Sequence, residues 1–372
     1  MLPVPSVFVT LLFLILLAAA GVGLVVFTLL SAVRAIVLPR SERVALNSVV
    51  FGGVRWAVYQ IARRGATYAE RDRVMSLIGP LGLLVLPIVW LSLLSLGYTM
   101  LYYALGIHDW LRAYDISGSA LLTLRPPQYH VGLPIRMLVF SEACLGLLMV
   151  ALLVTYLPTI YNAFTRREAI VVQLELRAGL PISAAGLVCW LQQSGGLHDS
   201  LVAGGGTSIW AQWEQWFLDI EESHTSLPVL SVFRAREPGR SWVTAAAVIL
   251  DTTAIISACT DAAADPHRTL CLKAGVITVN RVARFFEGSI QPADNLPHGA
   301  VAFNRAQFAA AYEQLRAADV AVRGSEDDSW TAFRELRGRY QEALTRLAHL
   351  AMAPVMEGGM RPSSPAAATD DF

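Results

Sequence analysis

The sequence has 372 residues, of which 55% are hydrophobic and only 16% are charged, and its mean hydropathy is +0.49. Soluble domains carry about 25% charged residues, so this composition predicts a protein embedded in lipid. The net charge is zero and the isoelectric point is near 7.1, which excludes the basic surface that nucleic-acid binding requires.

Three long stretches are almost free of charge. Residues 1–33 and 74–107 carry no charged side chain, and residues 137–165 carry one, Glu142. Each stretch exceeds the roughly 20 apolar residues that cross a bilayer as a helix, so we predict three membrane-spanning helices. The first is expected to be a retained anchor, because it lacks the basic start of a signal peptide and its apolar run is longer.

The arginines predict the orientation of these helices. Eight of them lie between the first and second stretches, and Arg166 and Arg167 directly follow the third. Positive flanks remain in the cytoplasm. We therefore expect a multi-pass protein of the bacterial inner (cell) membrane with its N-terminus outside, residues 108–135 outside and its C-terminal half inside. Arg166 and Arg167 are expected to anchor the third helix at the interface.

The stretch that follows the first span, residues 41–73, has apolar residues at near-helical spacing with arginines between them. This pattern predicts one or two amphipathic helices. Two interpretations stay open: the segment lies on the inner leaflet, or it is a helical linker packed on the cytoplasmic part.

The C-terminal half predicts an all-α cytoplasmic domain over residues 166–353 and a disordered tail over 354–372. Ser183 is expected to cap a helix that runs to Leu191. Further helix faces are marked by large side chains at helical spacing: Trp210, Trp213, Trp216 and Phe217; Phe308, Tyr312 and Leu315; and Trp330, Phe333, Leu336, Tyr340, Leu344 and Leu347, this last helix capped by Ser329 with Asp327 and Asp328 in front of it.

Residues 242–259 are apolar enough to suggest a fourth span, but Asp251 lies at their centre. A carboxylate in lipid is costly, so we predict a buried helix of the cytoplasmic domain instead. The sequence contains no GxxxxGK[ST], HExxH or GxSxG motif, and its four cysteines do not have the spacing of a zinc site. We therefore expect no enzyme activity, no cofactor and no metal.

Residues 113–128 lie between the second and third spans and read as a re-entrant pore loop: a short helix dips in from outside, turns, and is followed by a spanning helix. Irregular backbone at membrane depth is tolerated only where it is buried in protein or lines water. Asp115, Ser117 and Ser119 suit the entry of this helix, because short polar side chains cap free N–H groups.

At these residues the chain resembles the two-transmembrane potassium channel module, and more closely a group of bacterial membrane proteins classed as potassium-channel-like. Ser119 and Thr123 match the serine and threonine positions of pore helix and filter, and Gly146 matches the glycine hinge. Residues 222–230 and 238–242 are similar to segments of the bacterial group. The resemblance implies an ion-channel-like module over 74–165, with outer helix, pore loop and inner helix, and a homotetramer that encloses an ion path. Residues 1–40 and 41–73 would then be an N-terminal anchor and a cytoplasmic segment.

The chain departs from the module at the filter itself, where it has Thr123, Leu124, Arg125, Pro126 and Pro127. Both filter glycines are missing, and the prolines fix the backbone that should present stacked carbonyls to potassium. We expect a channel-like pore without potassium selectivity, or a non-conducting membrane sensor or scaffold that keeps the fold. Arg125 either faces the path or extends to the outer interface.

Two residues of the third span have alternative roles. Glu142 is a functional intramembrane carboxylate, or it holds the pore helix by hydrogen-bonding the loop or pairing with Arg125. Gly146 is a hinge, or it permits close packing. The expected partners are the lipid bilayer, further copies of the chain and an ion.

Overall fold

The computed structural model describes residues 4–36, 45–62, 73–124, 132–197, 208–235, 237, 240–287, 301, 303–351 and 353. These residues are helical and form no strand; one isolated bridge joins Thr260 and Val322. The prediction of an all-α protein is therefore confirmed for the described residues. The chain divides into two compact units, Met1–Asn162 and Ala163–Phe372, and the division falls inside one long helix, α6 (Leu133–Ala178).

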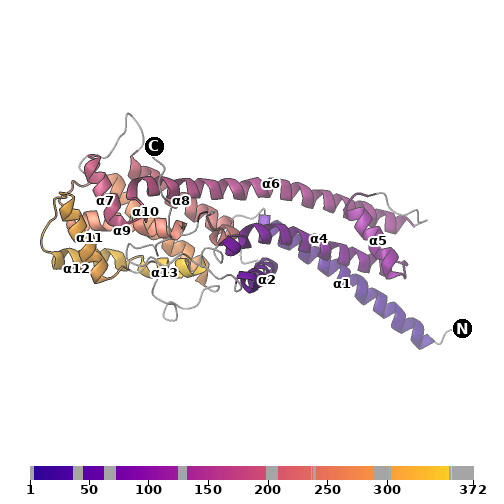
Figure 1. Ribbon diagram of the computed structural model, residues 1–372. Helices are drawn as coiled ribbons and strands as arrows, with labels where there is room; N and C mark the ends of the chain where they lie inside the picture. Colours follow the sequence, from indigo (N-terminus) through magenta and orange to yellow (C-terminus); the bar gives the residue numbers. More distant parts are fainter. Residues whose placement is uncertain are drawn as a thin grey trace. The chain divides into compact units, whose positions relative to one another are not determined.

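The first unit contains α1 (Val4–Ile36), α2 (Ala45–Ala62), α4 (Ile78–Ala104), α5 (Trp110–Leu121) and the first part of α6. Helix α1 packs along α4, and Gly21 and Gly97 make this approach close: a Cβ added at Gly21 would lie 2.8 Å from the Gly97 carbonyl oxygen. The short α5 lies between the C-terminal end of α4 and the N-terminal part of α6 (Figure 1). A small core joins α1, α4, α5 and α6 around Leu94, Tyr102 and Ile116.

Four helices are long and apolar enough to cross a membrane: α1, α4, α6 and α9 (Trp242–Cys259). In the most apolar part of α1, α4 and α6, only 11%, 39% and 17% of the residues are buried by protein. Such apolar surface is typical of helices in lipid, because water would not tolerate patches of this size. In α9 the buried share is 94%, so other helices of the protein cover its apolar surface. This confirms the prediction of a buried helix.

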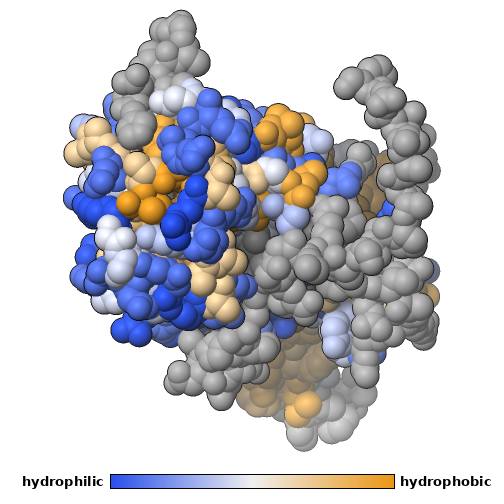
Figure 2. Space-filling view, turned by 60° about the vertical axis from the view of Figure 1, so that its left-hand side comes forward, coloured by the Kyte–Doolittle hydropathy of each residue, from blue (hydrophilic) through white to orange (hydrophobic). Residues whose placement is uncertain are grey.

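The second unit is built around α9. The other helices are α7 (Ala184–Gln193), α8 (Ile209–Ser226), the 3-10 helix η2 (Pro228–Val232), α10 (Pro266–Phe285), α11 (Arg305–Ala317), α12 (Glu326–Gly338) and α13 (Gln341–Leu350), together with the last part of α6. Helices α7, α10, α12 and α13 all pack against α9. The face of this unit seen in Figure 2 is largely hydrophilic, as expected for a water-exposed surface around an apolar core.

The predicted helix faces are largely confirmed. Ser183 caps α7, its hydroxyl accepting from Gly186 N at 3.0 Å, and the helix continues two residues past Leu191. The side chains that marked the next two faces lie buried on α8 and α11: Trp210, Trp213, Trp216, Phe217, Phe308, Tyr312 and Leu315.

The last predicted helix is wrong in two respects. Ser325, not Ser329, is its N-cap, because the Ser325 hydroxyl accepts from Asp328 N and places Asp327 and Asp328 inside the first turn. The Ser329 hydroxyl instead donates to the Arg323 carbonyl. The predicted single helix is also two helices, α12 and α13, with Tyr340 between them in a non-helical conformation.

Candidate functional site

Helix α5 stands where the sequence predicts a pore helix. It has 12 residues, about 18 Å, which is too short to cross a bilayer. Its N-cap is Asp109, whose carboxylate accepts from Leu111 N at 3.1 Å and Arg112 N at 3.4 Å. The prediction that Asp115, Ser117 and Ser119 cap the helix entry is therefore wrong, since all three lie inside the helix beyond its first turn.

The C-terminal end of α5 closes in a Schellman turn. Leu124 N donates to the Ser119 carbonyl at 2.8 Å and Thr123 N to the Ala120 carbonyl at 3.1 Å. This turn needs a residue in the left-handed region, which is Thr123 with φ +56°. A β-branched residue is strained in that conformation, so the predicted filter begins at a strained residue.

Glu142 joins three helices. Its side chain is fully buried in α6 and accepts hydrogen bonds from Tyr102 of α4 at 2.7 Å and from Ser117 of α5 at 2.5 Å. The Ser95 hydroxyl of α4 lies 2.9 Å from that of Ser117. The carboxylate thus bonds to the short helix through neutral hydroxyl groups. Of the roles that the sequence leaves open for Glu142, this geometry matches the one in which it holds the predicted pore helix.

Gly146 lies one turn further along α6 and touches the end of α5. A Cβ added there would lie 2.3 Å from the Leu121 carbonyl oxygen, closer than any real contact, and the obstacle is backbone. Only glycine permits α5 to approach α6 this closely. The close-packing role is therefore visible in the structure, and the hinge role remains a prediction.

The structure does not bring all the predicted site residues together. The Ser119 hydroxyl donates to the carbonyl of Asp115 in its own helix, and Thr123 and Leu124 are exposed in the single chain. Arg125, Pro126 and Pro127 lie outside the described residues, as do the tail over 354–372 and most of the segment 63–73.

The α4 side of this network was not predicted from the sequence. Ser95, Tyr98, Thr99 and Tyr102 stand at positions i, i+3, i+4 and i+7 of a mostly apolar helix, and all four are buried. Residues at such spacing share one helix face. This polar stripe inside a predicted span was the available signal.

In the second unit a buried arginine holds several elements. The guanidinium of Arg167 donates to the carbonyls of Leu230 and Phe233, both at 2.8 Å, and pairs with Glu168 at 2.8 Å. It also lies 3.3 Å from Nε2 of His224 and 6.0 Å from the centre of the Trp242 ring. The prediction that Arg167 anchors the third span at the lipid interface is wrong. Its side chain is buried, and its guanidinium is bound by the carbonyl of Leu230 in η2 and by that of Phe233 directly after η2.

Residues 222–230 and the helix start at Trp242 meet at this arginine, through His224 and Leu230 of the first and the ring of Trp242. His224 is fully buried, with Nδ1 at 3.0 Å from the Ile220 carbonyl. Nδ1 therefore donates, and Nε2 accepts from Arg167. Burial, and then the positive charge of Arg167, hold the pKa of His224 well below its usual 6.5.

Asp251 is confirmed within the core of the second unit. Its Oδ1 accepts from Arg337 Nε at 2.9 Å and from the Tyr340 hydroxyl at 2.8 Å. Burial, and then the negative charge of Asp251, raise the pKa of Tyr340 well above 10. A cavity of about 670 Å³ is lined by Asp251, Arg337 and side-chain amides of α11. The ion pair therefore both holds α12 to α9 and lines this cavity.

No group of three or more histidine, cysteine or acidic side chains among the described residues could hold a metal ion. The four cysteines are free. Comparison with known proteins identifies no relative: no protein family, no curated protein and no solved structure matches the chain.

Proposed function

We propose that this chain is a channel-like integral membrane protein in which α1, α4 and α6 cross the membrane and α5 is a re-entrant pore helix. Residues 74–165 form the channel-like module and α5 points toward the axis of a homotetramer. The second unit lies in the cytoplasm as an assembly or regulatory domain. The membrane is the bacterial inner membrane, with the N-terminus outside.

The observation that carries this proposal is the placement of α5. A helix too short to cross lies between two long apolar helices, bonded through Ser117 to a buried carboxylate and packed without a gap on Gly146. Polar side chains and irregular backbone at membrane depth are tolerated where protein surrounds them. A loop that began and ended in water would have no need of this support.

We further propose that this pore is not selective for potassium. Potassium filters present several backbone carbonyls in series, and glycines allow that conformation. Here two prolines and Arg125 follow Thr123. A ring of four arginines would repel cations, so we expect weak, unselective or anion-favouring flux.

Flux in proteoliposomes tests the pore. We expect no potassium-over-sodium selectivity in the unmodified protein, and a shift toward cations for Arg125→Gln, which removes the charge and keeps both prolines. Arg112→Gln is the matched control, because Arg112 is exposed at the start of α5. High potassium selectivity of the unmodified protein would refute the proposed filter.

The second candidate function is a non-conducting sensor or scaffold. The contact between Gly146 and Leu121 favours it, since it leaves α6 no room to bend toward α5 at the predicted hinge. Absence of any flux from a tetramer that is correctly inserted would decide for this alternative.

Topology has its own test. In a variant without the four native cysteines, single cysteines at Gln128 and Ser363 should react with an impermeant thiol reagent from opposite sides of the membrane. Labelling of both from one side would rule out the three-span arrangement.

A further inference from the structure

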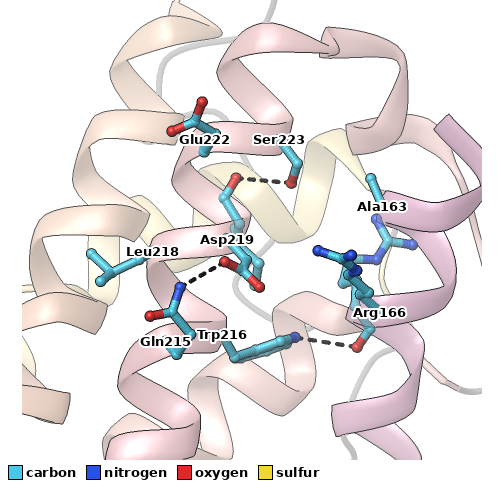
Figure 3. A pocket seen from close by; sticks show the side chains of 10 residues that line it. Ala163, Arg166, Gln215, Trp216, Leu218, Asp219, Glu222 and Ser223 are labelled. Carbon is cyan, nitrogen blue, oxygen red and sulfur yellow. Dashed lines mark hydrogen bonds between the residues drawn. The ribbon is translucent and has the colours of Figure 1, made fainter. Parts of the chain in front are cut away.

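A second cavity, of about 320 Å³, lies in the second unit between the last part of α6 and α8. Ala163, Arg166 and Arg167 line it from α6, and Gln215, Asp219 and Glu222 are among the residues that line it from α8; Figure 3 shows the labelled side chains of the two helices on opposite sides. Its volume lies at the lower end of the range for small-ligand sites, about 300 to 1,000 Å³. It is therefore large enough for one small polar group.

The cavity is lined by side chains of both charges, and they do not form ion pairs with one another. Arg166, Asp219 and Glu222 are exposed, and no ion pair joins any of them to another charged side chain among the described residues. The carboxylate of Asp219 only accepts from the Gln215 amide, at 2.9 Å. By contrast, the neighbouring Arg167 is buried and fully bonded. Among the described residues that line the cavity, Arg166 of α6 and Asp219 and Glu222 of α8 therefore carry charges that no ion pair neutralises.

The place of the cavity in the chain points to its ligand. Arg166 directly follows the third predicted span, and Tyr161, 66% exposed, lies just over one turn before it, as is usual for aromatic residues at the lipid interface. Leu218, which is 46% exposed, and Trp216 give the cavity an apolar part of its lining. Under the proposed three-span topology, on which this inference rests, the cavity opens at the level of the cytoplasmic lipid headgroups.

We propose that this cavity binds the zwitterionic headgroup of phosphatidylethanolamine. Arg166 binds the phosphate, and Asp219 and Glu222 accept hydrogen bonds from the ammonium group. A phosphatidylglycerol headgroup would bring no cation for the two carboxylates and would meet their repulsion. A choline headgroup has the charge but no N–H to donate.

Native mass spectrometry of the purified full-length protein in detergent tests this assignment. The probes are dioctanoyl phosphatidylethanolamine, phosphatidylcholine and phosphatidylglycerol, and inorganic phosphate. We expect phosphatidylethanolamine to half-saturate the protein at a concentration at least fivefold lower than the other lipids, and phosphate not to bind. Arg166→Gln and Asp219→Asn should each weaken this binding about tenfold, the typical effect of losing one charge-assisted hydrogen bond.

Arg316→Gln is the matched control, because Arg316 is a 60% exposed arginine on α11, away from the cavity. It should leave lipid binding unchanged. Equal binding of the three lipids, or unchanged binding by both cavity variants, would overturn the assignment. Tighter binding of phosphatidylglycerol or phosphate, strengthened by Asp219→Asn, would show an anion site and would also overturn it. Thiol labelling at Gln128 and Ser363 tests the topology separately, so a failure of lipid selectivity with intact labelling refutes the headgroup site alone.

Discussion

Helices α6 and α9 make an instructive pair, because each carries one acidic residue in a long apolar stretch. In α9 the apolar side chains are covered by α7, α10, α12 and α13, whereas in the apolar part of α6 most of them face away from the protein. Both acidic residues are nevertheless buried, at 0% exposure for Glu142 and 4% for Asp251. Burial of the acidic side chain therefore does not reveal whether the rest of its helix is surrounded by protein.

The two carboxylates differ in their partners. Asp251 is bonded to a cation, Arg337, and to one hydroxyl, whereas the hydrogen bonds to Glu142 from described residues come from the hydroxyls of Tyr102 and Ser117 alone. A buried ion pair becomes costly when one member is removed, since an uncompensated charge stays behind. When a carboxylate is held by neutral donors, removal of one partner should cost less stability. Four unfolding measurements, two in each unit, test how differently the two units are held together.

The largest effect is expected for Arg337→Leu. Among the described residues it leaves Asp251 buried with Tyr340 as its one hydrogen-bond partner, and it should lower the free energy of unfolding of the second unit by about 3 to 5 kcal/mol. Tryptophan fluorescence of the full-length protein in detergent, followed through urea unfolding, measures it. Arg339→Leu is the control, since Arg339 is 59% exposed and should change stability by less than about 0.5 kcal/mol. Equal losses in the two variants would contradict a special role for the pair.

Glu142→Leu should have the next largest effect, a loss of about 2 to 4 kcal/mol in the first unit. It leaves the buried hydroxyls of Tyr102 and Ser117 without this acceptor, and each such group costs about 1 to 3 kcal/mol. Glu142→Gln keeps one carbonyl oxygen and should lose less than half as much. Thermal unfolding in detergent compares the two; if Gln and Leu were equally damaging, hydrogen bonding would not be the reason.

Gly146→Ala should cost about 1 to 3 kcal/mol, because the new Cβ would force the Leu121 carbonyl and the end of α5 away from α6. Gly118→Ala in α5 is the matched control: a Cβ there meets nothing within 4 Å, and alanine is the better helix former by about 0.5 to 1 kcal/mol. The same thermal unfolding assay applies. A neutral Gly146→Ala would remove the close contact as an explanation for this glycine and favour the hinge.

The smallest effect is a pH dependence from His224. Its pKa is depressed in the folded state, so between pH 6.5 and that lower pKa the unfolded chain binds a proton that the folded chain does not. This contribution to stability is complete above pH 6.5 and is lost on acidification, by up to about 1.4 kcal/mol per pH unit. Urea unfolding at pH 7.5 and 5.5 measures it, and His224→Gln should reduce the difference. An unchanged difference would show that other groups carry it.

Much of the fold follows from local rules and was predictable. The apolar lengths of α1, α4 and α6 mark membrane-type helices, and the predicted burial of α9 in protein is confirmed. The cap at Ser183 and the aromatic faces of α8 and α11 also follow from spacing alone. The predicted single helix is instead broken at Tyr340, whose hydroxyl bonds to Asp251, 89 residues away in the sequence.

At the candidate site, local sequence is enough to place a short polar-flanked segment before a span with one acidic residue and one glycine, because charge and side-chain size are local properties. The bond of Ser117 to Glu142, the contact of Gly146 with Leu121 and the burial of Arg167 come from the packing of the helices. Each of these depends on which backbone or hydroxyl group another helix presents at that point. Burial of a polar side chain is set by partners distant in the sequence, and helical periodicity contains no information about them.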